Sequence, residues 1–250
     1  MANLLIDTPL FYLRKSFILY LKNTVDNSRT EYCGNLNNNS DILTLITPMY
    51  KGESIQGNQR GVCRWKVGKT REYFHTHPYV SKTYPSYEDI LSIAAKPSLD
   101  RRLSIIATLW GIWYIYKEDY QENLEDDIKE KERLTKVYNE EIALEFYKAQ
   151  YHKNTSKTHS KPYDNTVKQA LYFPLKLFNA EFEKYCCLGF INWDDIISLS
   201  TSSNPVPFYR FQLKSDLGFF FRKVSRKVSR KSKRVSRKVS RKSKRYINMV

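Results

Sequence analysis

Two histidines, a serine and an aspartate lie close together in the chain and could hold and use a metal ion. His75 and His77 occur in the run FHTHP, and Ser86 and Asp89 follow in the run PSYED. Residues i and i+2 of a β-strand point to the same face of a sheet, so the two imidazoles can converge on one cation. Asp89 can supply a third ligand from the first turn of a following helix.

Three protein ligands leave a fourth tetrahedral position for water, which is the arrangement of catalytic rather than structural zinc sites. Zinc lowers the pKa of a bound water to about 7 and so makes it a nucleophile at neutral pH. The reaction also needs a base that accepts the proton of the water, and Glu31, in the run EYCGNL, is the candidate. These residues predict a zinc-dependent hydrolase.

The segments around these residues predict the elements that position them. KTREYFHTH, at 69–77, predicts a strand that carries both histidines. PSYEDILSIAA, at 85–95, predicts a helix in which Ser86 is the N-cap and Asp89 completes a capping box. SIIAT and GIWYIY, which two residues separate, predict a hairpin in the centre of a sheet.

Apolar spacing and turn residues predict further elements outside this region. An amphipathic helix is expected at 9–22, and two extended stretches are expected at 30–50, with an Asn-rich turn at 37–40 between them. A long, charged, solvent-facing helix is expected at 121–150, although it could instead lie across the mouth of the site. Another helix is expected at 167–185, followed by a late strand in the run FYRFQL.

The runs ExCGxL, HTHP and PSxxD, in this order, resemble the core pattern of the JAMM (MPN+) metalloprotease family over residues 10–120. The resemblance implies an α/β fold of three layers, αβα, around a mixed sheet, related to the cytidine deaminases. It implies that His75, His77 and Asp89 bind zinc. It also implies that Glu31 is the general acid and base, and that the hydroxyl of Ser86 helps to stabilise the oxyanion.

For function, the resemblance implies cleavage of an amide or isopeptide bond in a conjugate of a ubiquitin-like modifier, as in a deubiquitinase. A zinc deaminase is disfavoured, because its PCxxC signature is absent. A plainer interpretation is that His75 and His77 form a satisfied surface pair and that Ser86 and Asp89 only cap a helix. A further alternative is an inert scaffold of this fold, or a nucleic-acid-binding protein that acts through a basic tail.

The positive charge is concentrated at one end of the chain. The 250 residues carry a net charge of +16, from 42 basic and 26 acidic residues, but residues 222–245 hold fourteen Lys and Arg and no acid. Without this segment, 28 basic residues face 26 acidic ones, so the remainder is near neutral. A segment of such composition cannot bury a core, and we expect a disordered tail. Its expected partner is nucleic acid, bound through phosphates, or another anionic surface.

The remaining composition favours a soluble, intracellular protein in the cytoplasm or nucleus. Cys33, Cys63, Cys186 and Cys187 form no CxxC pair and are too few for a disulfide framework, which favours a reducing compartment. The start of the chain lacks signal-peptide features, and the longest apolar run is too short to cross a bilayer. Abundant Asn, Lys, Ile and Tyr are typical of an AT-rich genome, such as that of a large DNA virus.

Three regions are therefore expected along the chain. Residues 1–120 are expected to form a catalytic core of the MPN/JAMM type, and 121–221 to add the charged helix, a polar linker and the C-terminal part of the fold. Residues 222–250 form the basic tail of low complexity, in which an eleven-residue unit at 223–233 is repeated at 234–244 with one substitution.

Overall fold

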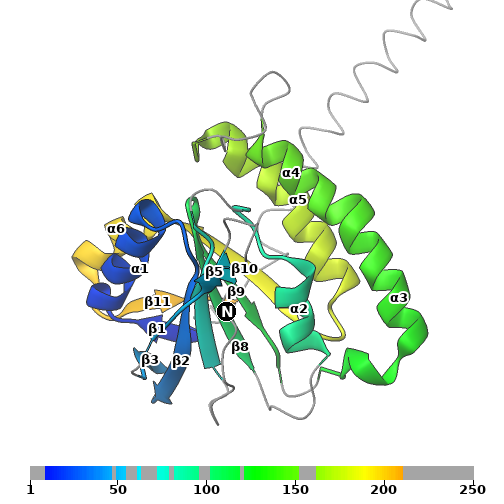
Figure 1. Cartoon of the computed structure of the whole chain (residues 1–250), viewed down its shortest axis with the longest axis horizontal. Helices are drawn as coiled ribbons and strands as arrows, with labels where there is room; N and C mark the ends of the chain where they lie inside the picture. Colours follow the sequence, from blue (N-terminus) through cyan, green and yellow to red (C-terminus); the bar gives the residue numbers. More distant parts are fainter. Residues whose placement is uncertain are drawn as a thin grey trace, which may run out of the picture. The chain divides into compact units, whose positions relative to one another are not determined.

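The computed structural model describes residues 9–46, 49–54, 61–62, 72–78, 82–95, 102–118, 121–151 and 162–210. Within them a mixed β-sheet is covered by helices on both faces (Figure 1). The predicted α/β class with a mixed sheet is confirmed. The predicted basic tail lies outside the described residues.

The main sheet has the strand order β10-β9-β8-β7-β2-β3-β1-β11, and a short strand, β4, also pairs with β2. Its strands are β1 (Phe11–Leu13), β2 (Tyr32–Asn39), β3 (Ile42–Leu45), β4 (Tyr50–Lys51), β7 (Glu72–Thr76), β8 (Leu103–Thr108), β9 (Gly111–Tyr116), β10 (Cys187–Asn192) and β11 (Val206–Phe208). The β7–β8 and β1–β3 pairs are parallel and the other pairs are antiparallel. A separate two-stranded ladder joins β5 (Glu53–Ser54) and β6 (Gly61–Val62).

Each face of the sheet packs against its own group of helices (Figure 1). One face is covered by α1 (Lys15–Asn27) and α6 (Trp193–Ser202). The other is covered by α2 (Tyr87–Ala94), α3 (Ile128–Val137), a π-helical turn η3 (Tyr138–Ile142), α4 (Ala143–Gln150) and α5 (Asn165–Glu181), with a 3-10 turn η2 (Leu124–Asp126) before α3. The sheet therefore has two separate apolar cores, one on each face.

The β8–β9 hairpin lies inside the sheet, as the sequence predicts. All twelve residues of its two strands are buried, because helices cover both faces and neighbouring strands cover both edges. Gly111 opens β9 at a place where β10 comes close, and a Cβ atom there would lie 2.2 Å from the carbonyl oxygen of Ile191. A hydrogen at this position lets the two strands approach.

The first predicted helix is wrong in its first part. Residues 11–13 form β1, which pairs with β3 and β11, and α1 begins only at Lys15 and runs on to Asn27. Phe11 and Leu13 are buried and Tyr12 is half-buried, which is strand alternation over too few residues to stand out from the helical spacing that follows. The two extended stretches at 30–50 are confirmed as β2 and β3. The turn predicted at 37–40 is shifted, because residues 37–39 pair with β3 and the chain turns at Ser40 and Asp41, which both have positive φ.

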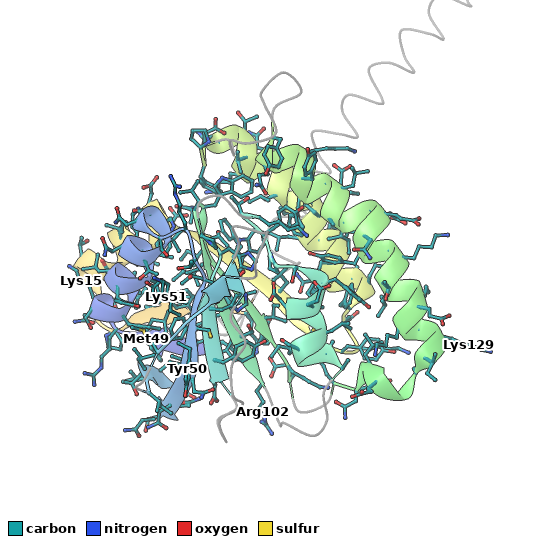
Figure 2. All side chains as sticks on the ribbon, in the orientation of Figure 1. Lys15, Met49, Tyr50, Lys51, Arg102 and Lys129 are labelled. Carbon is teal, nitrogen blue, oxygen red and sulfur yellow. The ribbon has the colours of Figure 1, made fainter. Side chains whose placement is uncertain are left out.

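The charged helix predicted at 121–150 exists but is not solvent-facing all round. From Ile128 to Gln150 it runs through α3, η3 and α4, and Leu134, Tyr138, Ile142 and Phe146 are buried against the sheet side. Two other apolar side chains of this helix, Ile128 and Leu144, are 71% and 45% exposed. Figure 2 shows Lys129 projecting outward from α3, away from the sheet.

Both sides of the boundary expected at residue 120 contribute to one sheet, since β10 adds to β9 and β11 adds to β1. The helix predicted at 167–185 is confirmed as α5, whereas β10 and α6 were not predicted. The late strand is β11, which shares only Phe208 with the predicted run; residues 211–213 lie outside the described part. Among the described residues, no helix has both the length and the apolar character needed to cross a membrane.

The cysteines differ in state. Cys186 and Cys187 are free thiols, and burial raises the pKa of both; the neighbouring thiol adds to this for Cys186. Cys33, on β2, is disulfide-bonded. This bond argues against the reducing compartment that the number and spacing of the cysteines favour.

Candidate metal centre

Strand β7 carries His75 but ends at Thr76, one residue before His77, so the predicted strand holds only the first of the two histidines. His75 lies within the strand, paired with Cys33 of β2 on one side and Ile106 of β8 on the other. His77 follows the strand, and its backbone N–H donates to the carbonyl of Ala107 at 2.8 Å. The backbone of both residues is thus held by neighbouring strands, and their side chains share one face of the sheet.

The start of α2 delivers the aspartate through the predicted capping box. Ser86 Oγ accepts a hydrogen bond from the backbone N–H of Asp89 at 3.2 Å, and the backbone N–H of Ser86 donates to Asp89 Oδ2 at 2.6 Å. This pair of bonds satisfies the first turn of the helix and also fixes the rotamer of the Asp89 carboxylate.

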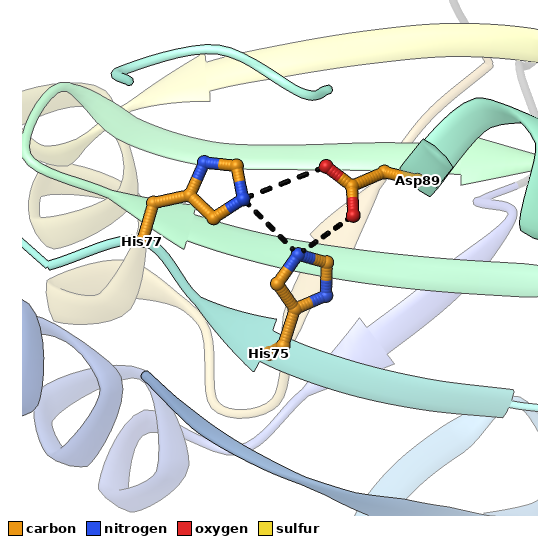
Figure 3. Close-up of side chains that lie close together, drawn as sticks. All are labelled: His75, His77 and Asp89. Atoms are coloured by element: carbon orange, nitrogen blue, oxygen red, sulfur yellow. Dashed lines mark hydrogen bonds and ion pairs between the residues drawn. The ribbon is translucent and has the colours of Figure 1, made fainter. Parts of the chain in front are cut away.

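The three side chains converge, as Figure 3 shows. His75 Nε2 lies 3.1 Å from Asp89 Oδ1, His77 Nε2 lies 3.5 Å from Asp89 Oδ2, and the two Nε2 atoms are 3.2 Å apart. Ligands at zinc distances of about 2.0–2.1 Å stand about 3.3 Å from one another in a tetrahedron. The separation of the two Nε2 atoms is close to that edge length, whereas the two histidines approach different oxygens of Asp89. One ligand atom from each side chain lies within 4.8 Å of the others, so the group could hold a metal ion.

The hydrogen bond on the far side of His77 fixes its ring for metal binding. Its Nδ1 lies 3.1 Å from the carbonyl oxygen of Lys82, which can only accept, so Nδ1 carries the hydrogen. In the neutral ring, Nε2 then presents its lone pair to His75 and Asp89. A backbone carbonyl behind a histidine ligand is a common outer-shell support of zinc sites.

Burial and charge both act on the cluster. His75 and His77 are 7% and 5% exposed, so the interpretation as a surface pair is wrong. Burial alone would lower the pKa of His75, but the charge and the hydrogen bond of Asp89 outweigh it and raise the pKa. Burial would likewise raise the pKa of Asp89, but the two histidines bring it well below its usual range. The carboxylate is therefore ionised and favours a positive charge at this point.

Glu31 lies near the cluster but is not one of its converging ligands. It directly precedes β2, and its backbone carbonyl accepts from the N–H of Gly52 at 2.8 Å. The next residue, Tyr32, donates its N–H to Thr76 Oγ1 at 2.9 Å, which ties the start of β2 to the end of β7. The Glu31 carboxylate is close enough to contribute to the raised pKa of His75.

Sequence reasoning missed the groups that hold the segment between the ligands. Thr83 donates from its N–H and from Oγ1 to Gln150 Oε1, and its carbonyl accepts from the Trp113 indole. Tyr138 donates to the carbonyl of Pro85. These partners are 30 to 67 residues away in the sequence, so no local pattern could have marked them.

A cavity of about 480 Å³ lies away from the candidate centre. It is bounded by the second half of α1, residues 28–30, Tyr32 and Lys51, and none of the three ligands lines it.

No protein-family model, no curated protein and no solved structure matches the chain. The chemistry of the candidate centre is therefore argued from its own residues.

Proposed function

We propose that this chain is a zinc-dependent hydrolase that cleaves an amide or isopeptide bond, with its JAMM (MPN+)-like motif as the reaction centre. The observation that carries the proposal is the convergence of His75 Nε2, His77 Nε2 and the Asp89 carboxylate, with contacts of 3.1 to 3.5 Å between them. The hydrogen bond from His77 Nδ1 to a backbone carbonyl adds support, because it leaves Nε2 to bind a cation.

The donor set favours zinc over harder cations. Two imidazole nitrogens and one carboxylate suit zinc, whereas magnesium and calcium prefer sites made of oxygen atoms. When bound, zinc supplies a Lewis acid that activates a water and polarises the carbonyl of the substrate. His75, His77 and Asp89 would hold the ion from one strand end and one helix start, and three protein ligands leave a fourth tetrahedral position for water.

Glu31 and Ser86 complete the proposed reaction. Glu31 accepts a proton from the attacking water and returns it to the leaving amine. Ser86 Oγ already accepts from the N–H of Asp89, so the hydroxyl hydrogen is left to donate to the developing oxyanion. The proposed substrate, a conjugate of a ubiquitin-like modifier, follows from the motif resemblance.

Metal analysis combined with an activity panel tests this proposal. The full chain should carry one zinc and should cleave at least one probe in a panel of ubiquitin-like modifiers linked to lysine through an isopeptide bond. Chelation should abolish the cleavage, and added zinc should restore it. A purified chain that binds no zinc would contradict the metal centre, and a zinc-loaded chain that cleaves no amide substrate would contradict the hydrolase.

A second candidate function, favoured by the fourteen basic residues at 222–245, is phosphate binding by the tail of an otherwise inert scaffold. Binding to a DNA duplex should weaken steeply between 50 and 200 mM salt for the full chain, by roughly 10³-fold or more if six or more phosphates are contacted. A chain that ends at residue 221 should lose this binding. If the scaffold interpretation holds, the full chain binds DNA but contains no zinc.

A further inference from the structure

The segment between the histidines and α2 supports two of the three proposed ligands. The carbonyl of Lys82 accepts the hydrogen on His77 Nδ1, and Ser86 holds the Asp89 carboxylate. The position of this segment, 82–86, therefore decides whether the imidazole and the carboxylate aim at the same point. A segment of this kind is not part of a helix or strand, so its shape depends on what packs against it.

The helix that runs from Ile128 to Gln150 packs against this segment and fixes it at two points. Gln150 Oε1 accepts from the backbone N–H of Thr83 at 3.1 Å and from Thr83 Oγ1 at 3.2 Å. Tyr138 donates its hydroxyl hydrogen to the carbonyl of Pro85. The helix therefore contacts Thr83, which follows Lys82, and Pro85, which precedes Ser86.

These hydrogen bonds are buried, so loss of one partner would leave the other without a replacement from water. Gln150 and Thr83 are each 1% exposed, and the opposite side of Thr83 is held by the Trp113 indole N–H, which donates to its carbonyl at 2.8 Å. A buried polar group that loses its partner bears the full cost of desolvation, so water cannot readily replace Gln150. Thr83 is therefore held on both sides, by Gln150 and by Trp113.

The π-helical turn η3 places both helix residues on the same side. Twelve α-helical residues separate Tyr138 from Gln150 by about 120° around the axis, at about 100° per residue. The π turn at Tyr138–Ile142 inserts one extra residue and so reduces that angle to about 20°. Gln150 and Tyr138 therefore lie on nearly the same side of the helix, toward segment 82–86.

We propose that Gln150 and Tyr138 are positioning residues of the metal centre: they lock segment 82–86 so that His77 and Asp89 aim at one ion. The inference rests on the proposed function, because it assumes that His75, His77 and Asp89 bind zinc. Neither residue touches the ion or the substrate. The charged helix thereby has a role in the site although it lies outside the motif.

Zinc affinity of full-length variants tests this inference. Gln150→Met keeps the size of the side chain but removes the acceptor, and Tyr138→Phe removes only the hydroxyl. Loss of an outer-shell partner typically costs roughly 10–100-fold in metal affinity, so each variant should bind zinc about 10-fold more weakly in competition with a chromophoric chelator.

Two matched controls lie elsewhere in the fold. Asn179 is a buried amide that bonds to Leu175 and Leu188, and Tyr114 is a buried tyrosine whose hydroxyl donates to the carbonyl of Tyr209. Asn179→Leu and Tyr114→Phe should lower the unfolding midpoint of the metal-free chain as Gln150→Met and Tyr138→Phe do. They should leave zinc affinity unchanged.

A readout without metal separates positioning from zinc binding itself. In the metal-free chain, NMR should show the His77 Nδ1 hydrogen exchanging faster with solvent in Gln150→Met than in the wild type, because its acceptor is released. Unchanged affinity and unchanged exchange would overturn the inference. If Gln150→Met does not fold, Tyr138→Phe decides through its affinity. A wild-type chain that binds no zinc contradicts the proposed function instead, and the exchange measurement still tests whether Gln150 fixes His77.

Discussion

Helices α2 and α6 begin in the same way, but only α2 faces imidazoles. The side chains of the N-caps Ser86 and Asn192 each accept a hydrogen bond from the N–H of an aspartate three residues on, Asp89 or Asp195. Each cap also donates to that carboxylate, Ser86 from its backbone N–H and Asn192 from its side-chain Nδ2. Asp195 is exposed, whereas Asp89 is largely buried with two histidine nitrogens within 3.5 Å. A cap can therefore hold a carboxylate firmly without making it part of a ligand cluster.

The path of the chain into each helix explains the difference. Helix α6 starts at the residue after β10, so Asn192 ends the strand and caps the helix at once. Helix α2 is reached from β7 through a longer segment, which lets its first turn lie beside the strand end that carries His75 and His77. Ordering such a segment costs conformational entropy, and the bonds from Gln150 and Tyr138 offset that cost.

Removing the carboxylate from each helix start should separate the two sites most clearly. Asp195→Ala should cost about 1 kcal/mol of stability, because it removes half of a capping pair. Asp89→Ala should cost more in the metal-free chain, because it also removes the partner of His75. Only Asp89→Ala should also lose zinc, by more than the roughly 10–100-fold that loss of an outer-shell partner costs. Metal content and chelator competition measure this, and equal zinc binding by both variants would disprove the ligand role of Asp89.

The parts of the site that the sequence predicts are local. His75 and His77 share a strand face by period, and Ser86 and Asp89 form a cap by spacing, so each pair is specified within four residues. The hairpin of β8 and β9 is equally local, since β-branched and aromatic runs flank a two-residue turn. These features depend on backbone geometry alone, and tertiary packing did not change them.

The parts that the sequence does not predict depend on distant partners. The strand at Phe11–Leu13 forms because β3 and β11 lie beside it, and its three residues cannot outweigh the helical spacing that follows. Strand β10 has a glycine in its middle, which weakens the strand signal. Gln150 is chemically unremarkable in the sequence, and only the folded chain brings it to Thr83 across 67 residues.

The site at α2 should need Glu31 as a general base in addition to its three metal ligands. Glu31→Gln should keep zinc, because Glu31 is not among the converging ligand atoms. Its turnover of an isopeptide probe should fall by about 10²–10⁴-fold, since the amide cannot accept the proton of the attacking water. Loss of the metal in this variant would instead make Glu31 a ligand or a structural group.

The third prediction separates capping from chemistry at the two N-caps. Glycine costs an N-cap only a few tenths of a kcal/mol relative to serine or asparagine, so Ser86→Gly and Asn192→Gly should be mildly destabilising. Ser86→Gly should also lower kcat by about 10²–10³-fold if its hydroxyl stabilises the oxyanion. Asn192→Gly should leave kcat unchanged. Equal kcat values in both variants would reduce Ser86 to a cap.

The smallest expected effect is the pH dependence of the metal-free chain, which measures what the His75–Asp89 pair contributes without an ion. The folded-state pKa of Asp89 is depressed, so its contribution is present above its unfolded pKa and is lost as the pH falls through the folded value. The folded-state pKa of His75 is raised, so its contribution is present below its unfolded pKa and is lost as the pH rises through the folded value.

The pair should therefore stabilise the chain most between about pH 4 and about pH 6.5, which are the usual pKa values of the two side chains. In that window Asp89→Asn should unfold more easily than the wild type by about 1.5–3 kcal/mol, the range for hydrogen bonds to charged groups. Chemical unfolding in the presence of a chelator measures the difference at each pH. His75→Gln should give the same profile, and the double variant should lose little more than either single one, because both remove the same pair. A difference that stays constant from pH 4 to pH 9 would show that Asp89 acts on the metal-free fold only as the cap of α2.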